Sequence, residues 1–213
     1  MRKALAVLLV IAGLAVALYP LAQSFYGDYR TGRHLEAFEE IQEREAPEPP
    51  AVEGQPAPRG EPRAAAEEPP AEEKQEEPYR GPPPIAVLEI PVIGLRLPVL
   101  EGASDYNLRY GAALLEGTAG IGEQGNTVLT AHRAHAYGRL FNRLDELEEG
   151  DEIVLVAADS RFSYRVFSTA VVEAEDTSYL ADDPEKRRLT LVTCHPLYRP
   201  NPPYRLVVQA EMD

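Results

Sequence analysis

The sequence of 213 residues has a single cysteine, Cys194, and only four histidines. One thiol cannot form a disulfide within the chain, so a disulfide-stabilised fold is excluded, and so is a zinc site built from several cysteines. The few histidines leave little material for a metal centre of another kind. We therefore expect no metal and no cofactor, and the lone thiol needs an explanation of its own.

The sequence also lacks a surplus of basic residues. It has 21 lysines and arginines against 35 acidic residues, and its formal net charge is −14. Proteins that bind nucleic acids neutralise phosphates with a basic face and release counterions. A nucleic acid is therefore not expected as a partner of a chain this acidic.

The N-terminus contains the longest apolar run. Arg2 and Lys3 are followed by 19 almost entirely apolar residues, 4–22, which at helical rise come close to the roughly 30 Å of a bilayer's hydrocarbon core. A cleaved signal peptide is the competing interpretation, but its apolar stretch is usually only about 7–15 residues long. We expect a retained single-pass membrane anchor over 1–26. Because basic residues precede it, the N-terminus should be cytoplasmic and the rest of the chain extracellular.

The segment 27–84 is rich in glutamate, alanine and proline, and twelve of the 20 prolines lie in 47–84. Such a composition buries too little apolar surface to offset the entropy of ordering, and prolines with like charges keep a chain extended. We expect a disordered extracellular linker. In its first part Leu35, Phe38 and Ile41 recur at helical spacing, so a helix could continue out of the membrane.

From residue 85 onward, short apolar runs alternate with turn residues, which is the pattern of β-strands. The runs, dominated by Val, Leu, Ile, Thr and Tyr, cover 85–90, 97–102, 126–131, 152–158, 161–174, 189–193 and 204–210. Helices are expected at 137–147, where leucines recur at helical spacing, and around 179–180. Seven or eight short strands in 85–213 predict a mainly β domain with a closed or nearly closed barrel.

Cys194 follows the strand-like run LTLVT and directly precedes His195 and Pro196. Alternation along a strand places it on the face of Val192 and opposite to Thr193. A thiol at this position can face a groove on a rigid support, and it becomes a nucleophile if a nearby base or cation favours the thiolate. The alternative is a buried small hydrophobic residue, which is the commonest state of a free cysteine.

Three histidines are candidates for that base. His132 ends the run NTVLTA much as Cys194 ends LTLVT, so parallel pairing of the two strands would bring imidazole and thiol to one rim of the barrel. His135 lies three residues further on in a loop, where a solvated surface histidine is expected. His195 adjoins the cysteine, but neighbours on a strand point apart, so it is not expected to be the base.

Arg205 is the candidate for stabilising negative charge. It begins the run YRLVVQA, and antiparallel pairing with the preceding strand would place it near Cys194. A guanidinium keeps its charge at any working pH and offers two N–H donors to an oxyanion or a peptide carbonyl. The alternatives are a plain surface arginine at 205 and use of Arg199, in the connecting loop, for the same purpose.

Together these residues resemble the sortases, the cysteine transpeptidases of Gram-positive surfaces. TLVTC (190–194) is similar to the family's TLxTC signature, GNTVLTAHR (125–133) to its histidine segment, and RLVV (205–208) to its arginine strand. The resemblance covers the chain from residue 85 to the C-terminus, about 60% of its length. The stretch 132–151 looks most like the class D sortases.

The resemblance implies an eight-stranded sortase-type barrel with one or two short helices in a catalytic domain of residues 85–213. It also implies a peptidase acting through acyl transfer, in which Cys194 cleaves an LPxTG-like sorting signal of secreted proteins and forms a thioacyl intermediate. His132 would move the protons, and Arg205 would hold the substrate and the oxyanion. Thr193 would help to bind the substrate. The acceptor would be an amine of a cell-wall precursor.

Several alternatives stay open beside this hypothesis. Pilin-polymerising sortases commonly have a second hydrophobic segment and a lid with a DPW-like motif, and because the sequence shows neither we expect wall attachment. A pilin polymerase and a non-catalytic membrane-anchored surface module remain alternatives. An L,D-transpeptidase is a further one, although its cysteine typically follows glycine and Cys194 follows Thr193. Some sortases bind calcium through loop carboxylates, so the acidic stretches 146–151 and 173–176 leave calcium modulation open.

Overall fold

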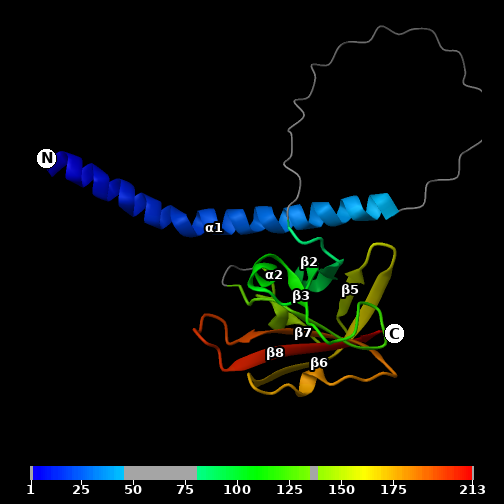
Figure 1. Cartoon of the computed structure of the whole chain (residues 1–213). Helices are drawn as coiled ribbons and strands as arrows, with labels where there is room; N and C mark the ends of the chain where they lie inside the picture. Colours follow the sequence, from blue (N-terminus) through cyan, green and yellow to red (C-terminus); the bar gives the residue numbers. More distant parts are fainter. Residues whose placement is uncertain (1, 46–80, 135–138, 213) are drawn as a thin grey trace, which may run out of the picture.

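The computed structural model describes residues 2–45, 81–134 and 139–212 (Figure 1). Eight strands form a closed barrel in the order β1-β2-β3-β4-β7-β8-β6-β5. Their bounds are Ala86–Ile90 (β1), Leu95–Glu101 (β2), Ala112–Leu114 (β3), Gly125–Thr130 (β4), Glu152–Val156 (β5), Arg161–Glu173 (β6), Arg187–His195 (β7) and Tyr204–Met212 (β8). Neighbouring strands are antiparallel except for the parallel pairs β2–β3 and β4–β7. The mainly β, closed eight-stranded barrel that was predicted is confirmed.

One face of each strand fills the barrel, and the other face points outward. In β7 the side chains of Leu189 and Leu191 are fully buried in the main core inside the barrel. Val192, on the opposite face, belongs to a second and smaller apolar cluster with Val128 of β4 and Val207 of β8. Because side chains alternate along a strand, this outer cluster marks the outward faces of three adjacent strands.

A short helix and a short strand follow β2, and neither was expected from the sequence. The helix α2, Asp105–Tyr110, begins after Ser104, whose side chain accepts a hydrogen bond of 3.2 Å from the backbone N–H of Asn107. Gly111 ends it, and the carbonyl oxygen of Pro98 lies where a side chain at 111 would stand. The strand β3 has only three residues, too few for an alternating pattern to be seen in a sequence.

The helix expected over 137–147 is wrong for the described residues 139–147, which hold only the 3₁₀ turn η2, Leu144–Glu146. Leu140 has a φ of 47°, in the left-handed region that a helix cannot contain. The leucines of this segment are nevertheless all buried in the main core. Their spacing in the sequence therefore indicated correctly that they are buried, but it did not indicate a helix. Two further 3₁₀ turns are η1, Pro91–Ile93, and η3, Ser178–Leu180, the latter in place of the second expected helix.

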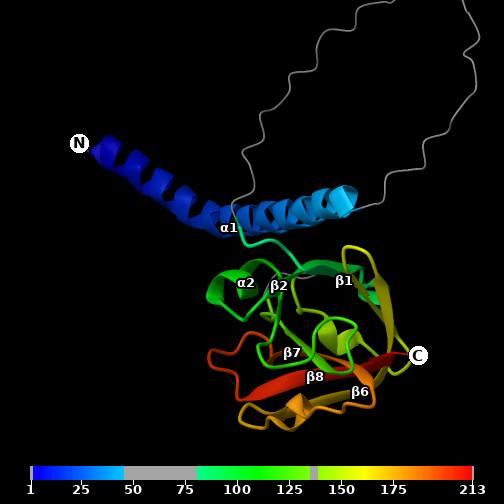
Figure 2. The same cartoon turned by 45° about the vertical axis from the view of Figure 1, so that its right-hand side comes forward.

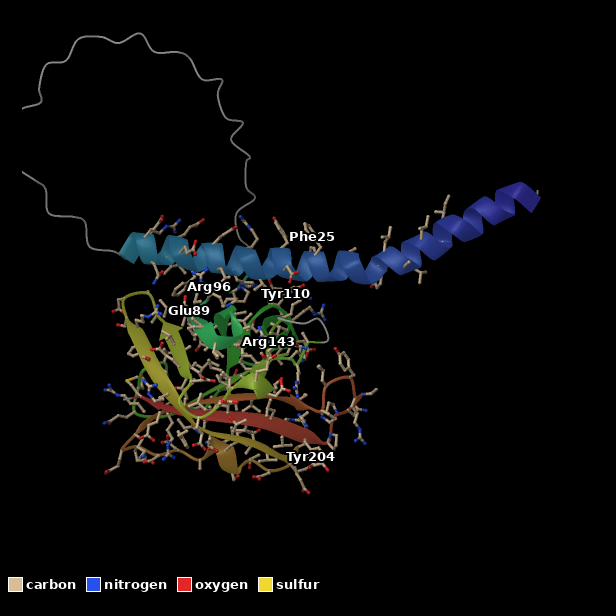
Figure 3. The ribbon with its side chains drawn as sticks, turned by 180° about the vertical axis from the view of Figure 1, so that it is seen from behind. Phe25, Glu89, Arg96, Tyr110, Arg143 and Tyr204 are labelled. Atoms are coloured by element: carbon tan, nitrogen blue, oxygen red, sulfur yellow. The ribbon has the colours of Figure 1, made fainter. Side chains whose placement is uncertain are left out.

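The longest element is the helix α1, Arg2–Glu45, whose C-terminal part lies along the barrel beside β1, β2 and α2 (Figures 1 and 2). Phe38 and His34 of this helix are buried against the barrel. The hydroxyl of Thr31 donates to the carbonyl of Tyr110 at 3.0 Å, and Arg96 of β2 pairs with Glu39 at 3.0 Å. In Figure 3, Tyr110 and Arg96 lie between α1 and the barrel, whereas Phe25 lies on the helix surface turned away from it.

These contacts correct one prediction. Residues 27–45 were assigned to a disordered linker, but they are helical and packed on the barrel, because their apolar side chains find partners there. The helix suggested for the first part of the linker is confirmed. The rest of the predicted linker, 46–80, lies outside the described residues. Among the described residues, none of the helices combines the length and the apolar character needed to cross a membrane, so the anchor expected over 1–26 is not confirmed.

Candidate active site

His132, Cys194 and Arg205 line one cavity of about 280 Å³ on the barrel. Cys194 lies in β7 and Arg205 in β8, whereas His132 lies two residues beyond the end of β4. The thiol and the guanidinium belong to partly buried residues, and His132 is exposed at the rim. The three residues that the sequence predicted as nucleophile, base and charge-stabilising cation are therefore neighbours in space.

The strand register explains why these three residues meet. β4 runs parallel to β7 with Thr130 opposite Val192, so two further residues on each chain segment bring His132 level with Cys194. β7 runs antiparallel to β8, and Cys194 is directly opposite Arg205. Both strand pairings that the sequence analysis required are confirmed.

The three side chains also share the outward face of the barrel. Cys194 and Arg205 are each two residues away from the outer-cluster valine of their own strand, Val192 or Val207, so alternation directs them to the same side as that cluster. His132, beyond the end of β4, lines the same cavity as Val128 and Val192. The thiol is thus on the surface side of its strand and not in the barrel core, which answers the alternative of a buried structural cysteine.

The walls of this cavity are mainly apolar and come both from barrel strands and from segments outside them. Leu108 of α2, Leu115 and Tyr179 of η3 line it together with Val128 and Val192 of the outer cluster. Burial raises the pKa of the Tyr179 phenol, and the positive charge of Arg205 opposes this shift. The charge of Arg205 therefore lies close enough to the Tyr179 hydroxyl to affect its pKa.

Asn126 of β4 holds the segment that carries Tyr179. Its side-chain amide donates to the carbonyls of Tyr179 and Ala181, at 2.8 and 3.2 Å, and its oxygen accepts from the hydroxyl of Thr190 at 2.7 Å. Asn126 is only 2% exposed, so all three bonds are made away from water. The sequence analysis missed this residue, because a lone asparagine in a strand-like run gives no signal of its partners.

Arg205 is oriented by its own loop. Its Nη1 donates to the carbonyls of Pro202 and Tyr204, at 3.1 and 3.0 Å. These bonds hold one arm of the guanidinium at the entrance of β8, where Arg205 lines the cavity. Arg199, the alternative considered for the same task, is exposed in the loop and does not line this cavity.

Thr193 points to the other face of β7. Its side chain is 2% exposed, and its hydroxyl donates to the carbonyl of Ala131 at 2.8 Å. This bond ties the end of β7 to the end of β4, one residue before Cys194 and one residue before His132. A role of Thr193 in substrate binding stays a prediction, and the bond that it makes is to the protein.

A second, more open hollow of about 400 Å³ lies on the other side of the same pair. Cys194 and His132 line it together with Arg133 and with the β7–β8 connection, which includes Tyr198 and Arg199. In Figures 1 and 2 this connection projects at the end of the barrel opposite to the C-terminus. A substrate acyl group and a second reactant could therefore approach the thiol from two sides.

The remaining histidine candidates do not replace His132. The ring of His195 points away from the first cavity, and its Nδ1 lies 2.8 Å from Nη1 of Arg133. That agrees with the expectation that adjacent residues on a strand point apart. His135 lies outside the described residues. Arg133 itself was missed by the sequence analysis, because its partners lie 62 residues away in β7 and in the segment after residue 138.

In the described part of the chain, no three side chains from His, Cys, Asp and Glu gather closely enough to hold a metal ion. Carboxylates of the acidic stretches instead bond to nearby protein groups. Glu146 pairs with Arg143 at 2.6 Å, and Asp176 accepts a bond of 2.8 Å from the N–H of Ser178. The hydrogen bond from Arg143 lowers the pKa of Glu146, and hydrogen bonds from the side chain and the N–H of Ser178 lower the pKa of Asp176.

Known proteins with similar sequences have been assigned to one family. The family model described as "Sortase domain" matches residues 88–213. Sortase D of Bacillus subtilis (strain 168) is 35% identical over 123 residues, which are 57% of this chain and 60% of that protein. Sortase A of Bacillus anthracis is 33% identical over 110 residues, 52% of this chain and 51% of that protein. The chain thus spans little more than half the length of these relatives.

Solved structures agree with these matches. Sortase A from Corynebacterium diphtheriae, a lid mutant, has a TM-score of 0.58 and 34% identity, covering 63% of this chain and 72% of that chain. A Clostridium perfringens Sortase D5 transpeptidase has a TM-score of 0.55 and 28% identity, covering 62% and 79%. The family match starts within β1 and runs through β8, so it includes every residue of the cavity described above. This chain therefore belongs to the sortase family.

Proposed function

We propose that this protein is a cysteine transpeptidase that cleaves an LPxTG-like sorting signal of secreted proteins and transfers the acyl group to a cell-wall amine. One observation carries the proposal. Cys194 is directly opposite Arg205 and beside the segment that follows β4 and carries His132, and all three line a single cavity. Nucleophile, proton carrier and permanent cation are the groups that acyl transfer from a peptide requires.

In the first step the Cys194 sulfur attacks the carbonyl carbon of the Thr–Gly or Thr–Ala bond. The thiol proton passes to His132, whose imidazolium then protonates the leaving amine as the C–N bond breaks. The products are a thioester on Cys194 and a free amine on the released C-terminal piece.

In the second step an incoming amine attacks the thioester carbon. His132 accepts a proton from this amine and returns one to the sulfur as the C–S bond breaks. The new amide bond joins the secreted protein to the acceptor, and the thiol is regenerated. The open hollow lined by Tyr198 and Arg199 offers the acceptor a route to the thioester from the side away from the first cavity.

Arg205 stabilises the negative charge that develops on the carbonyl oxygen in both steps. Its charge is permanent, and bonds to Pro202 and Tyr204 fix its orientation before the substrate arrives. A donor that needs no reorganisation in the transition state commonly contributes about 10²- to 10³-fold in rate.

The apolar walls fit the leucine and proline of such a signal. Leu108, Leu115 and Tyr179 can bury these side chains, and the cavity of about 280 Å³ has room for them. Thr193, which directly precedes Cys194 in β7, would then help to align the carbonyl of the substrate's threonine for attack by the thiol.

Two finer assignments belong to the same proposal. The match with Sortase D of Bacillus subtilis supports a class D member, and we expect attachment to the wall instead of pilin polymerisation. A non-catalytic surface module is the outcome if the thiol proves inert.

We also propose that residues 1–26 anchor the protein in the cell membrane, with the N-terminus cytoplasmic and the barrel extracellular. Arg2 and Lys3 before the apolar run support this orientation. The exposed aromatic side chains of Phe25 and Tyr29, 78% and 58% exposed, are of the kind that gathers at a membrane–water interface. Protease treatment of intact cells should remove the barrel and leave the N-terminal helix in the membrane fraction.

Turnover of a fluorogenic LPxTG-type peptide by the full-length chain in detergent tests the enzymatic proposal. Cys194→Ala and His132→Ala should each abolish turnover without changing the thermal unfolding midpoint. His34→Gln is a matched control at a histidine outside the cavity and should retain activity. Turnover by Cys194→Ala close to that of the parent would refute the proposal. Adding a wall-type amine or a lysine side chain in turn would show which acceptor is used.

A further inference from the structure

Arg133 and His195 each follow a proposed catalytic residue in the chain, and their side chains meet. Arg133 comes directly after His132, and His195 directly after Cys194. Nη1 of Arg133 lies 2.8 Å from Nδ1 of His195. This contact therefore joins the segment that carries the imidazole to the segment that carries the thiol.

The guanidinium of Arg133 is held from several sides. Its side chain is only 5% exposed, and Nη2 pairs with the carboxylate of Asp145 at 2.7 Å. Nε donates to the carbonyl of Asn142 at 3.4 Å. A guanidinium can only donate, so Nδ1 of His195 accepts this bond with its lone pair.

The contact lies where the backbone pairing of β4 and β7 stops. The last paired residues of these parallel strands are Thr130 and Val192. Beyond them the bond from Thr193 to the carbonyl of Ala131 precedes the reacting pair, and the bond between Arg133 and His195 follows it. Beyond the last paired residues of β4 and β7, two side-chain bonds thus connect the two segments, one before and one after the positions of His132 and Cys194.

We propose that Arg133 and His195 form a clamp that positions the His132 imidazole against the Cys194 thiol; this inference rests on the proposed transpeptidase function. Neither residue is a catalytic residue, because each acts through its neighbour. Proton transfer between sulfur and imidazole needs a fixed separation, and a misplacement of about 1 Å can cost about 10²-fold in rate. The clamp holds that separation without occupying the substrate cavity.

A purely structural role for Arg133 makes a different prediction. Its bonds to Asp145 and Asn142 fasten the segment 139–147, and losing that fastening would lower stability. Asp145 is 49% exposed, however, and an ion pair with an exposed partner contributes little to stability. The bond to His195 is the one that reaches β7, so removing either of its ends should affect the reaction.

The experiment compares five variants of the full-length chain with the parent, using an LPxTG-type peptide. Arg133→Met and His195→Leu should each lower kcat by about 10- to 100-fold, with KM within about threefold of the parent. The double variant should be no slower than the slower single variant, because both changes remove one interaction. His195→Asn places an amide oxygen near the former Nδ1 and should restore kcat to within a few-fold. Arg143→Met, a matched change in the same segment, should leave kcat unchanged, because Arg143 bonds to Glu146 and Ile93 away from the cavity.

A second readout needs no sorting signal. The rate at which a methanethiosulfonate reagent modifies Cys194 at pH 7 reports the thiolate that His132 stabilises, and it should fall in His195→Leu and recover in His195→Asn. If the parent cleaves no sorting peptide, the transpeptidase proposal fails, and this rate still tests the clamp. The clamp is overturned if His195→Leu and Arg133→Met react like the parent in both assays. Losses that multiply in the double variant would overturn it as well.

Discussion

Acidification from pH 7 to pH 5 should release the C-terminal part of α1 from the barrel, because a histidine is buried where the two meet. His34 is fully buried, and its ring centre lies 6.0 Å from that of Tyr106 and 6.2 Å from that of Tyr110 on α2. Burial, assisted by the nearby charge of Arg30, lowers the pKa of His34 from 6.5 to about 4. A proton on this imidazole is therefore poorly tolerated while α1 is docked.

The sign and size of the effect follow from this pKa. In the released helix the imidazole returns to its ordinary pKa of 6.5, so between pH 6.5 and 4 the released form binds more protons than the docked form. Docking is therefore weakened as the pH falls through 6.5, by roughly 2 kcal/mol at pH 5 and by about 3 kcal/mol below pH 4. Burying the Phe38 ring favours docking by about 1.5–3 kcal/mol. The docking free energy lost on acidification to pH 5 is therefore comparable to the contribution of this ring.

Hydrogen–deuterium exchange of residues 27–45 measures this release, once rates are corrected for the intrinsic effect of pH on exchange. The parent should show protection at pH 7 and much less at pH 5. His34→Gln has no titrating ring and should be equally protected at both pH values. Phe38→Ala should be less protected than the parent at both.

Two outcomes would refute this reasoning. Equal protection of the parent at pH 7 and pH 5 would mean that docking of α1 does not change the pKa of His34. A loss on acidification that is the same in His34→Gln would assign the effect to other groups. The elements that α1 packs against are β1, β2 and α2, so exchange in β7 should stay constant and serves as an internal control.

Two further predictions concern the cavity. Arg205→Lys keeps the charge but loses the planar pair of donors, so kcat/KM for an LPxTG-type peptide should fall by about 10²-fold while thiol modification slows only a few-fold; equal losses would mean that Arg205 mainly tunes the thiol. Asn126→Ala removes the bonds that hold Tyr179 over the cavity, so KM should rise by about 10-fold with a smaller change in kcat. Steady-state kinetics with thermal unfolding as a check on folding would decide this, and an unchanged KM would show that Tyr179 does not contact the peptide.

The parts of the site that were predictable from the sequence lie on strands. Alternation and simple rules of strand pairing place Cys194 beside His132 and opposite Arg205, because a strand fixes both the direction and the spacing of its side chains. The strand-like runs also predicted the barrel, although β3 is too short to leave a pattern.

The parts that were not predictable depend on contacts between distant segments. Leu140 and its neighbours recur at helical spacing because they are buried, yet the left-handed backbone at Leu140 prevents a helix. Residues 27–45 carry many charges and looked like a solvated spacer, but Phe38 and His34 find a surface formed by segments more than 50 residues away. His195, the partner of Arg133 in β7, is equally remote, so no local pattern could have indicated their contact.

The most direct test of the proposed mechanism is intact-mass spectrometry of the full-length protein with an LPxTG-type peptide and no added amine. The protein should gain the mass of the N-terminal acyl portion of the peptide, fragmentation should place it on Cys194, and an added amine should remove it. Arg205→Lys should form the same adduct more slowly, and Cys194→Ala should form none. A peptide that is cleaved without any adduct on Cys194 would contradict the thioacyl mechanism.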